Sequence, residues 1–348
     1  GLGDVYKRQP LAIFLNKKTG EILKDKEINE KIFNNFKENG SDSWFELSPE
    51  EILGEKYNSN EWEKIDDILD VWFDSGAMPY AQWHYPFENQ ALFKSNYPAD
   101  FIAEGVDQTR GWFFTLHAIS SLLNDRVAFK NVIANGLVLD KDGNKMSKRL
   151  GNAINPFEII EKYGPDATRW YMISNANPWD NLKFDANGIL DVQRKFFGTL
   201  SNTYSFFALY ANLDEFNFKE TNLTVADKTE SDLWIISRLN SIAREVDQYY
   251  NDYEPTKAAR TIQSFAVNDL SNWYVRLNRK RFWIGDYNSD KEIAYQTLYT
   301  CLNTIAQLIA PIAPFYAEKL FLDLNSCLLY TSDAADERSS VDLGGRRI

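Results

Sequence analysis

A short cationic run near the middle of the sequence could do chemistry on phosphates. The run is Lys145-Met146-Ser147-Lys148-Arg149, and it follows an apolar, strand-like segment. Ammonium groups on a loop can stabilise the charge that builds on a departing pyrophosphate during adenylyl transfer. Gly143 and Gly151 flank the run and could act as hinges. Taken alone, a lysine-rich loop after a strand is more often a solvated surface.

Two other stretches, residues 70–76 (DVWFDSG) and 104–113 (EGVDQTRGWF), combine carboxylates with tryptophans. An amino-acid substrate needs anionic or carbonyl groups for its ammonium and an apolar box for its side chain. The carboxylates could meet the ammonium, and the flat indole rings could wall the box. The candidate binding residues are Trp72, Glu104, Gly105, Asp107, Gln108 and Trp112. Spacing alone leaves a simpler alternative, in which the tryptophans belong to a core and the carboxylates cap a helix.

A third stretch, residues 271–283 (SNWYVRLNRKRFW), interleaves cations with aromatic residues. On a helix this pattern places Trp273 and Leu277 on the inner face, while Arg276, Arg279 and Lys280 share an outer face. Such a row of cations suits phosphate contacts along an RNA stem. The alternative is an ordinary solvated helix face. The candidate RNA-binding residues are Arg276, Arg279, Lys280 and Arg281.

Together these stretches resemble the class I aminoacyl-tRNA synthetases, and among them the isoleucyl enzymes. The pentapeptide is similar to the KMSKS loop of that family, with Arg149 in place of the final serine. Residues 70–76 and 104–113 resemble two runs of the isoleucyl enzymes at which the valyl and leucyl relatives carry different residues. Residues 271–283 resemble the anticodon-binding domain of this group. The resemblance covers about residues 10–325.

The resemblance implies a ligase that activates isoleucine with ATP to isoleucyl-adenylate and then transfers it to tRNA(Ile). It implies that Lys145 and Lys148 are catalytic and that residues 145–149 bind ATP. Mg²⁺ would accompany the substrate phosphates, without a metal bound by the protein itself. The implied partners are tRNA(Ile), isoleucine and ATP.

Two alternatives stay open at this point. A valyl enzyme would need a different side-chain box, and Trp72 with Trp112 argues against it. A non-catalytic RNA-binding helical module rests on residues 186–325 alone, and the cationic loop argues against it. The family's His-Ile-Gly-His element and editing domain do not occur in the sequence, so this chain alone is expected to be inactive. His117, on an apolar helix face, is expected to be a core residue.

Composition limits the setting in which the protein works. The 348 residues include 38 basic and 50 acidic ones, for a net charge of −12. This balance argues against a broad nucleic-acid coat but permits a local basic stripe. No run approaches the roughly 20 apolar residues of a membrane span, and no secretory signal opens the chain. Cys301 and Cys327 have no close Cys or His partner for a metal. A cytoplasmic monomer is expected.

The spacing of apolar residues predicts an α/β part followed by an all-α part. Strand-like residues 100–103, a helix beginning near Asp107, and the strand-like runs 131–134 and 137–139, broken by Asn135-Gly136, predict a β-α-β unit of a parallel sheet. With the resemblance, this unit becomes the C-terminal half of a Rossmann-like catalytic domain. From residue 186 the helical spacing predicts an antiparallel bundle. In it, Pro255 opens one helix and Ser289 begins a capping box on another.

The sequence therefore divides into five expected segments. Residues 10–70 are expected to be connective, residues 71–185 to be the catalytic half-domain, and residues 186–325 to be the helical anticodon-binding domain. Residues 1–9 and 326–348 lack the apolar pattern of the rest. They are expected to be a non-native leader and tail.

Overall fold

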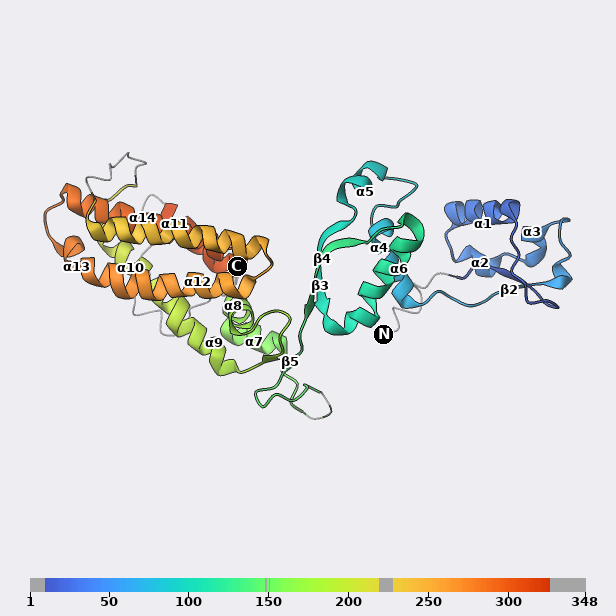
Figure 1. Cartoon of the computed structure of the whole chain (residues 1–348), viewed down its shortest axis with the longest axis horizontal. Coiled ribbons are helices and arrows are strands. Elements are labelled where there is room, and N and C mark those ends of the chain that lie inside the picture. Colours follow the sequence, from blue (N-terminus) through green and yellow to red (C-terminus); the bar gives the residue numbers. More distant parts are fainter. Residues whose placement is uncertain (1–9, 148, 150, 219–227, 326–348) are drawn as a thin grey trace. The chain divides into compact units, whose positions relative to one another are not determined.

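The computed structural model describes residues 10–147, 149, 151–218 and 228–325 of the chain. The chain forms two compact units that divide between Ala134 and Asn135 (Figure 1). The expected non-native leader and tail lie outside the described residues, and so does Lys148. Those expectations therefore stay predictions.

The first unit begins with a small subdomain that has its own core. Its strands β1 (Phe14–Asn16) and β2 (Trp62–Lys64) pair antiparallel, with Leu15 opposite Glu63. Between them lie α1 (Lys26–Asn39), α2 (Ser43–Glu46), α3 (Pro49–Leu53) and the 3-10 helix η2 (Ser59–Glu61). The buried side chains are Phe14, Ile28, Ile32, Trp44, Ile52 and Leu53. The segment predicted to be connective thus packs around apolar side chains of its own.

The rest of the first unit holds the predicted strand-helix-strand motif. Its elements are α4 (Val71–Ala81), α5 (Gln90–Asn96), β3 (Ala99–Gly105), the 3-10 helix η3 (Val106–Arg110), α6 (Trp112–Asn124) and β4 (Phe129–Asn135). Ala99 N donates to Ala128 O at 2.9 Å, so the paired strands β3 and β4 start side by side and run in the same direction. The helix begins at Trp112, later than predicted, because a 3-10 turn occupies the residues after β3.

Helices α4 and α6 pack closely because of a glycine. A Cβ on Gly76 would lie 2.9 Å from Ile119 Cδ1 and from the backbone of Thr115, so only glycine allows this approach. The two helices contribute to an apolar core under the paired strands. This core contains Tyr80, Phe93, Tyr97, Leu116 and Ala128.

The second unit opens with a short parallel pairing. Strand β5 (Val138–Leu139) pairs with β6 (Leu182–Lys183), with Val138 opposite Leu182. Helices α7 (Pro156–Tyr163) and α8 (Pro165–Asn175) lie between the two strands in sequence, and α9 (Ala186–Val192) follows β6. Gly136 leads into β5, and a Cβ there would lie 2.3 Å from Asp180 O. The strand-like run 137–139 thus forms β5, although the strand spans two residues.

The remainder of the second unit is the predicted helical bundle. Its elements are the π-helix η5 (Gln193–Phe197), α10 (Gly198–Leu213), α11 (Glu230–Asn251), α12 (Pro255–Ser264), the π-helix η7 (Phe265–Val275), α13 (Arg276–Trp283), α14 (Ser289–Ile309) and α15 (Pro314–Asn325). Figure 1 shows the long helices α11, α12 and α14 side by side. As predicted, Pro255 stands at the start of α12. One continuous core joins these helices to α8 and α9.

The facing of the basic helix differs from the prediction. Trp273 and Leu277 do not face inward, since their side chains are 56% and 61% exposed. Residues 265–275 form a π-helix, in which hydrogen bonds join residue i to residue i+5 and each turn is wider than an α-turn. The face of the helix rotates accordingly. Tyr274 and Asn278 therefore take the buried positions.

Two smaller expectations are also wrong. Helix α14 is capped by Asn288, whose side chain accepts a hydrogen bond from Lys291 N at 2.9 Å, and not by Ser289. His117 is exposed, whereas the buried positions of α6 are Phe113, Leu116 and Ser120.

Candidate active site and nucleic-acid interface

The cationic loop is held by a network of hydrogen bonds between its two ends. Asp140 Oδ1 accepts from Asp142 N at 3.0 Å and from Asn144 N at 2.8 Å. Asn152 Nδ2 donates to Asp140 Oδ2 at 2.9 Å, and Asn152 Oδ1 accepts from Ser147 N at 2.8 Å. The hydrogen bond from the Asn152 amide and those from Asn144 and Asp142 lower the pKa of the Asp140 carboxyl. The turn is therefore built around an ionised carboxylate.

Within this frame the side chains of the run point to different surroundings. Met146 packs against the core of the second unit. Lys145 and Arg149 are exposed, and Leu139 forms an antiparallel bridge with Lys145. An anchored methionine beside exposed cations is an arrangement that presents charge to a solute while fixing the chain.

The two tryptophans lie where α4 meets the start of α6. A Cβ on Gly111 would lie 3.2 Å from Trp72 Cη2, so the Trp72 ring covers this glycine. Gln108 Oε1 accepts from Trp112 N at 3.0 Å, and Trp112 Nε1 donates to Ser75 O at 3.1 Å. The structure thus brings Trp72, Gln108 and Trp112 together around one helix start.

The predicted carboxylates lie at the nearby end of β3. Glu104 and Asp107 are both exposed, and Gly105 lies between them. A Cβ on Gly105 would lie 2.5 Å from Asp107 Oδ1, so the Asp107 side chain folds back over the glycine. The carboxylates can therefore meet a cation from solvent without prior burial.

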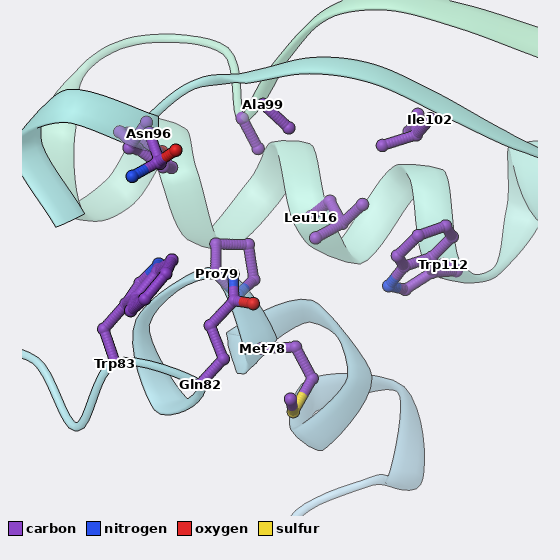
Figure 2. Close-up of a pocket in the computed structure, with 11 residues that line it drawn as sticks. Met78, Pro79, Gln82, Trp83, Asn96, Ala99, Ile102, Trp112 and Leu116 are labelled. Carbon is purple, nitrogen blue, oxygen red and sulfur yellow. The ribbon is translucent and has the colours of Figure 1, made fainter. Parts of the chain in front are cut away.

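A cavity of ≈ 220 Å³ lies beside Trp112 (Figure 2). Met78 and Pro79 of α4, Leu116 of α6 and Ile102 of β3 give it apolar walls, and Trp112 stands at one end. Trp72, Glu104 and Asp107 are not among its lining residues. The predicted set therefore does not converge on this cavity as a whole, because only Trp112 reaches from the helix start into the core.

The basic helix divides its cations between two roles. Arg276, Arg279 and Lys280 are exposed. Arg281 turns inward, and its side chain is 12% exposed. Its guanidinium contacts Asp232 Oδ1 at 2.8 Å and Asp290 Oδ1 at 2.8 Å. Geometry therefore separates Arg281 from the three neighbours with which sequence spacing grouped it.

The partner of Arg281 is a fully buried carboxylate. Burial raises the pKa of Asp232, but hydrogen bonds from Arg281, Thr229 and Tyr274 outweigh it and lower the pKa overall. Tyr274 Oη donates to Asp232 Oδ1 at 2.6 Å. Burial, followed by the adjacent carboxylate, raises the pKa of Tyr274. This network joins α11, η7, α13 and the start of α14.

Sequence reasoning missed the tie between Asp140 and Asn152. A signal for it existed, because Asp followed by Gly and Asn within a few residues is typical of turns in which the side chain accepts nearby backbone N–H groups. Among the described residues, no group of three His, Cys, Asp or Glu side chains could hold a metal ion. No helix in this part of the chain is long and apolar enough to cross a membrane.

Comparison with known families identifies the class. Residues 6–185 match the family of class I tRNA synthetases (I, L, M and V), and residues 232–342 match the anticodon-binding domain of tRNA ligases. The chain belongs to the class I tRNA synthetases. The second match runs past Asn325 into the segment expected to be a non-native tail.

Among curated proteins, the chain is similar to isoleucine–tRNA ligases. It is 75% identical to that of Cytophaga hutchinsonii over 74% of the chain and 68% identical to that of Bacteroides fragilis over 74% of the chain. The chain spans 23% of the length of each of these two relatives.

Solved structures share the fold. A leucyl-tRNA synthetase of Agrobacterium radiobacter K84, in a ternary complex with tRNA and LeuAMS, has a TM-score of 0.63 at 18% identity, over 94% of this chain and 42% of that one. A methionyl-tRNA synthetase of Mycobacterium tuberculosis with bound methionyl-adenylate has a TM-score of 0.61 at 17% identity, over 89% of this chain and 65% of that one.

Proposed function

We propose that this chain is part of an isoleucine–tRNA ligase. The observation that carries the proposal is the 64–75% identity to isoleucine–tRNA ligases of five bacterial strains over about three quarters of the chain. The whole protein would join isoleucine to ATP as isoleucyl-adenylate and then charge tRNA(Ile). We place it in the cytoplasm as a monomer.

In the first step an isoleucine carboxylate oxygen attacks the α-phosphorus of ATP. A bond from that oxygen to phosphorus forms, and the bond to the pyrophosphate oxygen breaks. Lys145 and Lys148 act on the departing phosphates, where negative charge develops. Met146, Ser147 and Arg149 complete the ATP-binding run. In the second step a ribose hydroxyl of tRNA attacks the acyl carbon and AMP leaves.

Mg²⁺ belongs to this reaction through the nucleotide. It prefers oxygen ligands and is commonly held by substrate phosphates with one or two carboxylates. In this proposal the ion is carried in with ATP. When bound, it neutralises phosphate charge.

The isoleucine site is assigned to the tryptophan pair and the adjacent carboxylates. Trp72 and Trp112 flank the start of α6 and offer flat apolar surfaces to a branched side chain. Glu104 and Asp107 offer charge for the ammonium, with Gly105 and Gln108 beside them. The donor bond from Trp112 Nε1 to Ser75 O supports the assignment because it holds one ring in place.

For tRNA we assign Arg276, Arg279 and Lys280. Their exposure on consecutive turns lets them neutralise phosphates along an RNA stem. Arg281 is assigned to the protein interior instead, because its guanidinium is already paired with Asp232 and Asp290.

The test is ATP–pyrophosphate exchange in the full-length protein that contains this chain. Lys148→Ala should slow exchange by about 10²–10³, by analogy with the loss of one charge-stabilising donor. Isoleucine binding should change far less, because the cation acts where charge develops. Lys141→Ala, at an exposed lysine of the same loop, is the matched control.

A second variant addresses the amino acid. Trp112→Ala should raise the isoleucine concentration needed for half-maximal exchange, since it removes a contact made in ground and transition states alike. Replacing isoleucine by valine in the wild-type assay separates the two substrate assignments. Faster exchange with valine, or a Lys148→Ala rate equal to wild type, would refute the proposal.

A further inference from the structure

One side chain, Asn152, joins the hydrogen bonds that hold the two ends of the cationic loop together. The Asn152 amide contacts three groups: it accepts from Ser147 N at 2.8 Å and donates to Lys145 O at 3.3 Å and to Asp140 Oδ2 at 2.9 Å. The main chain on both sides of Met146 is thereby fixed by one residue. Asp140 in turn orients that amide.

The charge of Asp140 is unexpected at this place. A carboxylate close to a loop that meets ATP repels phosphates, so on charge alone an asparagine would serve better. Hydrogen bonding explains the carboxylate. Its Oδ1 accepts two backbone N–H groups, while its Oδ2 accepts from the Asn152 amide. An asparagine at position 140 could keep the first pair but would turn its own NH₂ toward the NH₂ of Asn152.

We propose that Asp140 and Asn152 are positioning residues for the cationic loop. Asn152 fixes the backbone of Lys145 and Ser147, and Asp140 holds the Asn152 amide in the required orientation. The side chain of Lys145 then extends from a backbone of fixed conformation. It can meet the nucleotide phosphates without a further entropic cost of ordering the loop. The inference rests on the proposed function, because it takes ATP to be the ligand of the loop.

Three variants separate positioning from charge. Asp140→Asn removes a negative charge and places two donors face to face. Asn152→Asp adds a negative charge and places two acceptors face to face. The double variant D140N/N152D has the wild-type net charge and restores one donor opposite one acceptor between positions 140 and 152, with position 152 still accepting from Ser147 N. It does not restore the two longest contacts, from position 152 to Lys145 O at 3.3 Å and from Asn144 Nδ2 to position 140 at 3.4 Å, so its recovery measures the 140–152 pair and the Ser147 bond.

The readout is isoleucine-dependent ATP–pyrophosphate exchange in the full-length protein, with the rate and the Michaelis constants measured separately. Both single variants should slow exchange by about 10- to 100-fold, because catalytic groups displaced by about 1 Å lose this much. The Michaelis constant for isoleucine and the melting temperature should stay near wild type. The double variant should recover at least tenfold over the slower single variant.

A second readout does not depend on activity. In the 348-residue chain, hydrogen exchange at the Ser147 amide should speed up in Asp140→Asn and slow again in the double variant. If Asp140 and Asn152 served only the stability of the fold, the single variants would lower the melting temperature. The double variant would then not slow hydrogen exchange at Ser147 again.

If the charge at position 140 alone sets the rate of ATP–pyrophosphate exchange, Asp140→Asn carries out that reaction at or above the wild-type rate, and the inference is overturned. It is also overturned if the double variant is as slow as the slower single variant. Wild-type protein without isoleucine-dependent exchange would instead refute the proposed function, and the hydrogen-exchange pattern would still decide whether the tie orders the loop.

Discussion

Replacing Arg281 by methionine should destabilise the helical unit by about 3–5 kcal/mol, the usual cost of removing one partner of a buried ion pair. The Asp232 side chain is 0% exposed and receives the Arg281 guanidinium on both oxygens, at 2.8 and 3.0 Å. Without Arg281, a buried carboxylate keeps only hydroxyl and backbone donors. Methionine retains the aliphatic volume, so the loss is mainly electrostatic.

The cycle with Asp232→Asn isolates this pair. Removing the carboxylate charge as well should recover part of the loss, with a coupling of about 0.5–3 kcal/mol between the two positions. Arg276→Met is the matched control, because its side chain is exposed one turn earlier, and it should stay within about 0.5 kcal/mol of wild type.

The effect should also depend on pH with a definite sign. In the wild type the pKa of Asp232 is lowered, so its contribution to stability is present above the unfolded value of about 3.9 and is lost as pH falls through the folded pKa. In Arg281→Met, burial is less opposed and raises that pKa. The difference between variant and wild type should therefore be largest near neutral pH and shrink on acidification.

The assay is urea unfolding of the whole chain followed by far-UV circular dichroism. Native-state hydrogen exchange of the α11 and α13 amides should accompany it, because a chain of two units need not unfold in one step. A deficit for Arg281→Met no larger than that for Arg276→Met would refute the reasoning. The same would hold for a deficit that grows as pH falls.

Two further predictions concern the core and the RNA face. Trp170 is fully buried and stacks on Phe196 at 4.4 Å between ring centroids, so Trp170→Ala should cost about 3–5 kcal/mol in urea unfolding. Trp179→Ala, at a 47% exposed ring, should cost less than about 1 kcal/mol, and equal losses would contradict the burial. In the full-length protein, Arg279→Met should reduce the salt dependence of tRNA binding by about one phosphate contact. A tRNA-binding slope unchanged by that variant would remove Arg279 from the interface.

Local sequence determined the features that depend on near neighbours. Pro255 opens a helix because its fixed φ and missing N–H suit a first helical turn. The strand-helix-strand order and the helical bundle followed from apolar spacing, which reports the faces that must be buried. The cationic run, the tryptophan stretches and the basic helix could likewise be recognised in the sequence, and they indicated the class of protein.

Tertiary structure decided which side chains face which partners. Arg281 belongs with Asp232, 49 residues away, and only the tertiary structure shows that this cation is paired with a buried carboxylate of α11. Trp273 lies inside the π-helix of residues 265–275 and faces outward, because the wider turns of a π-helix shift the positions along it and no local pattern marks them. Asp140 and Asn152 are separated by a loop whose closure brings them within 2.9 Å. Spacing along a chain cannot specify such contacts, since they depend on how the backbone returns to itself.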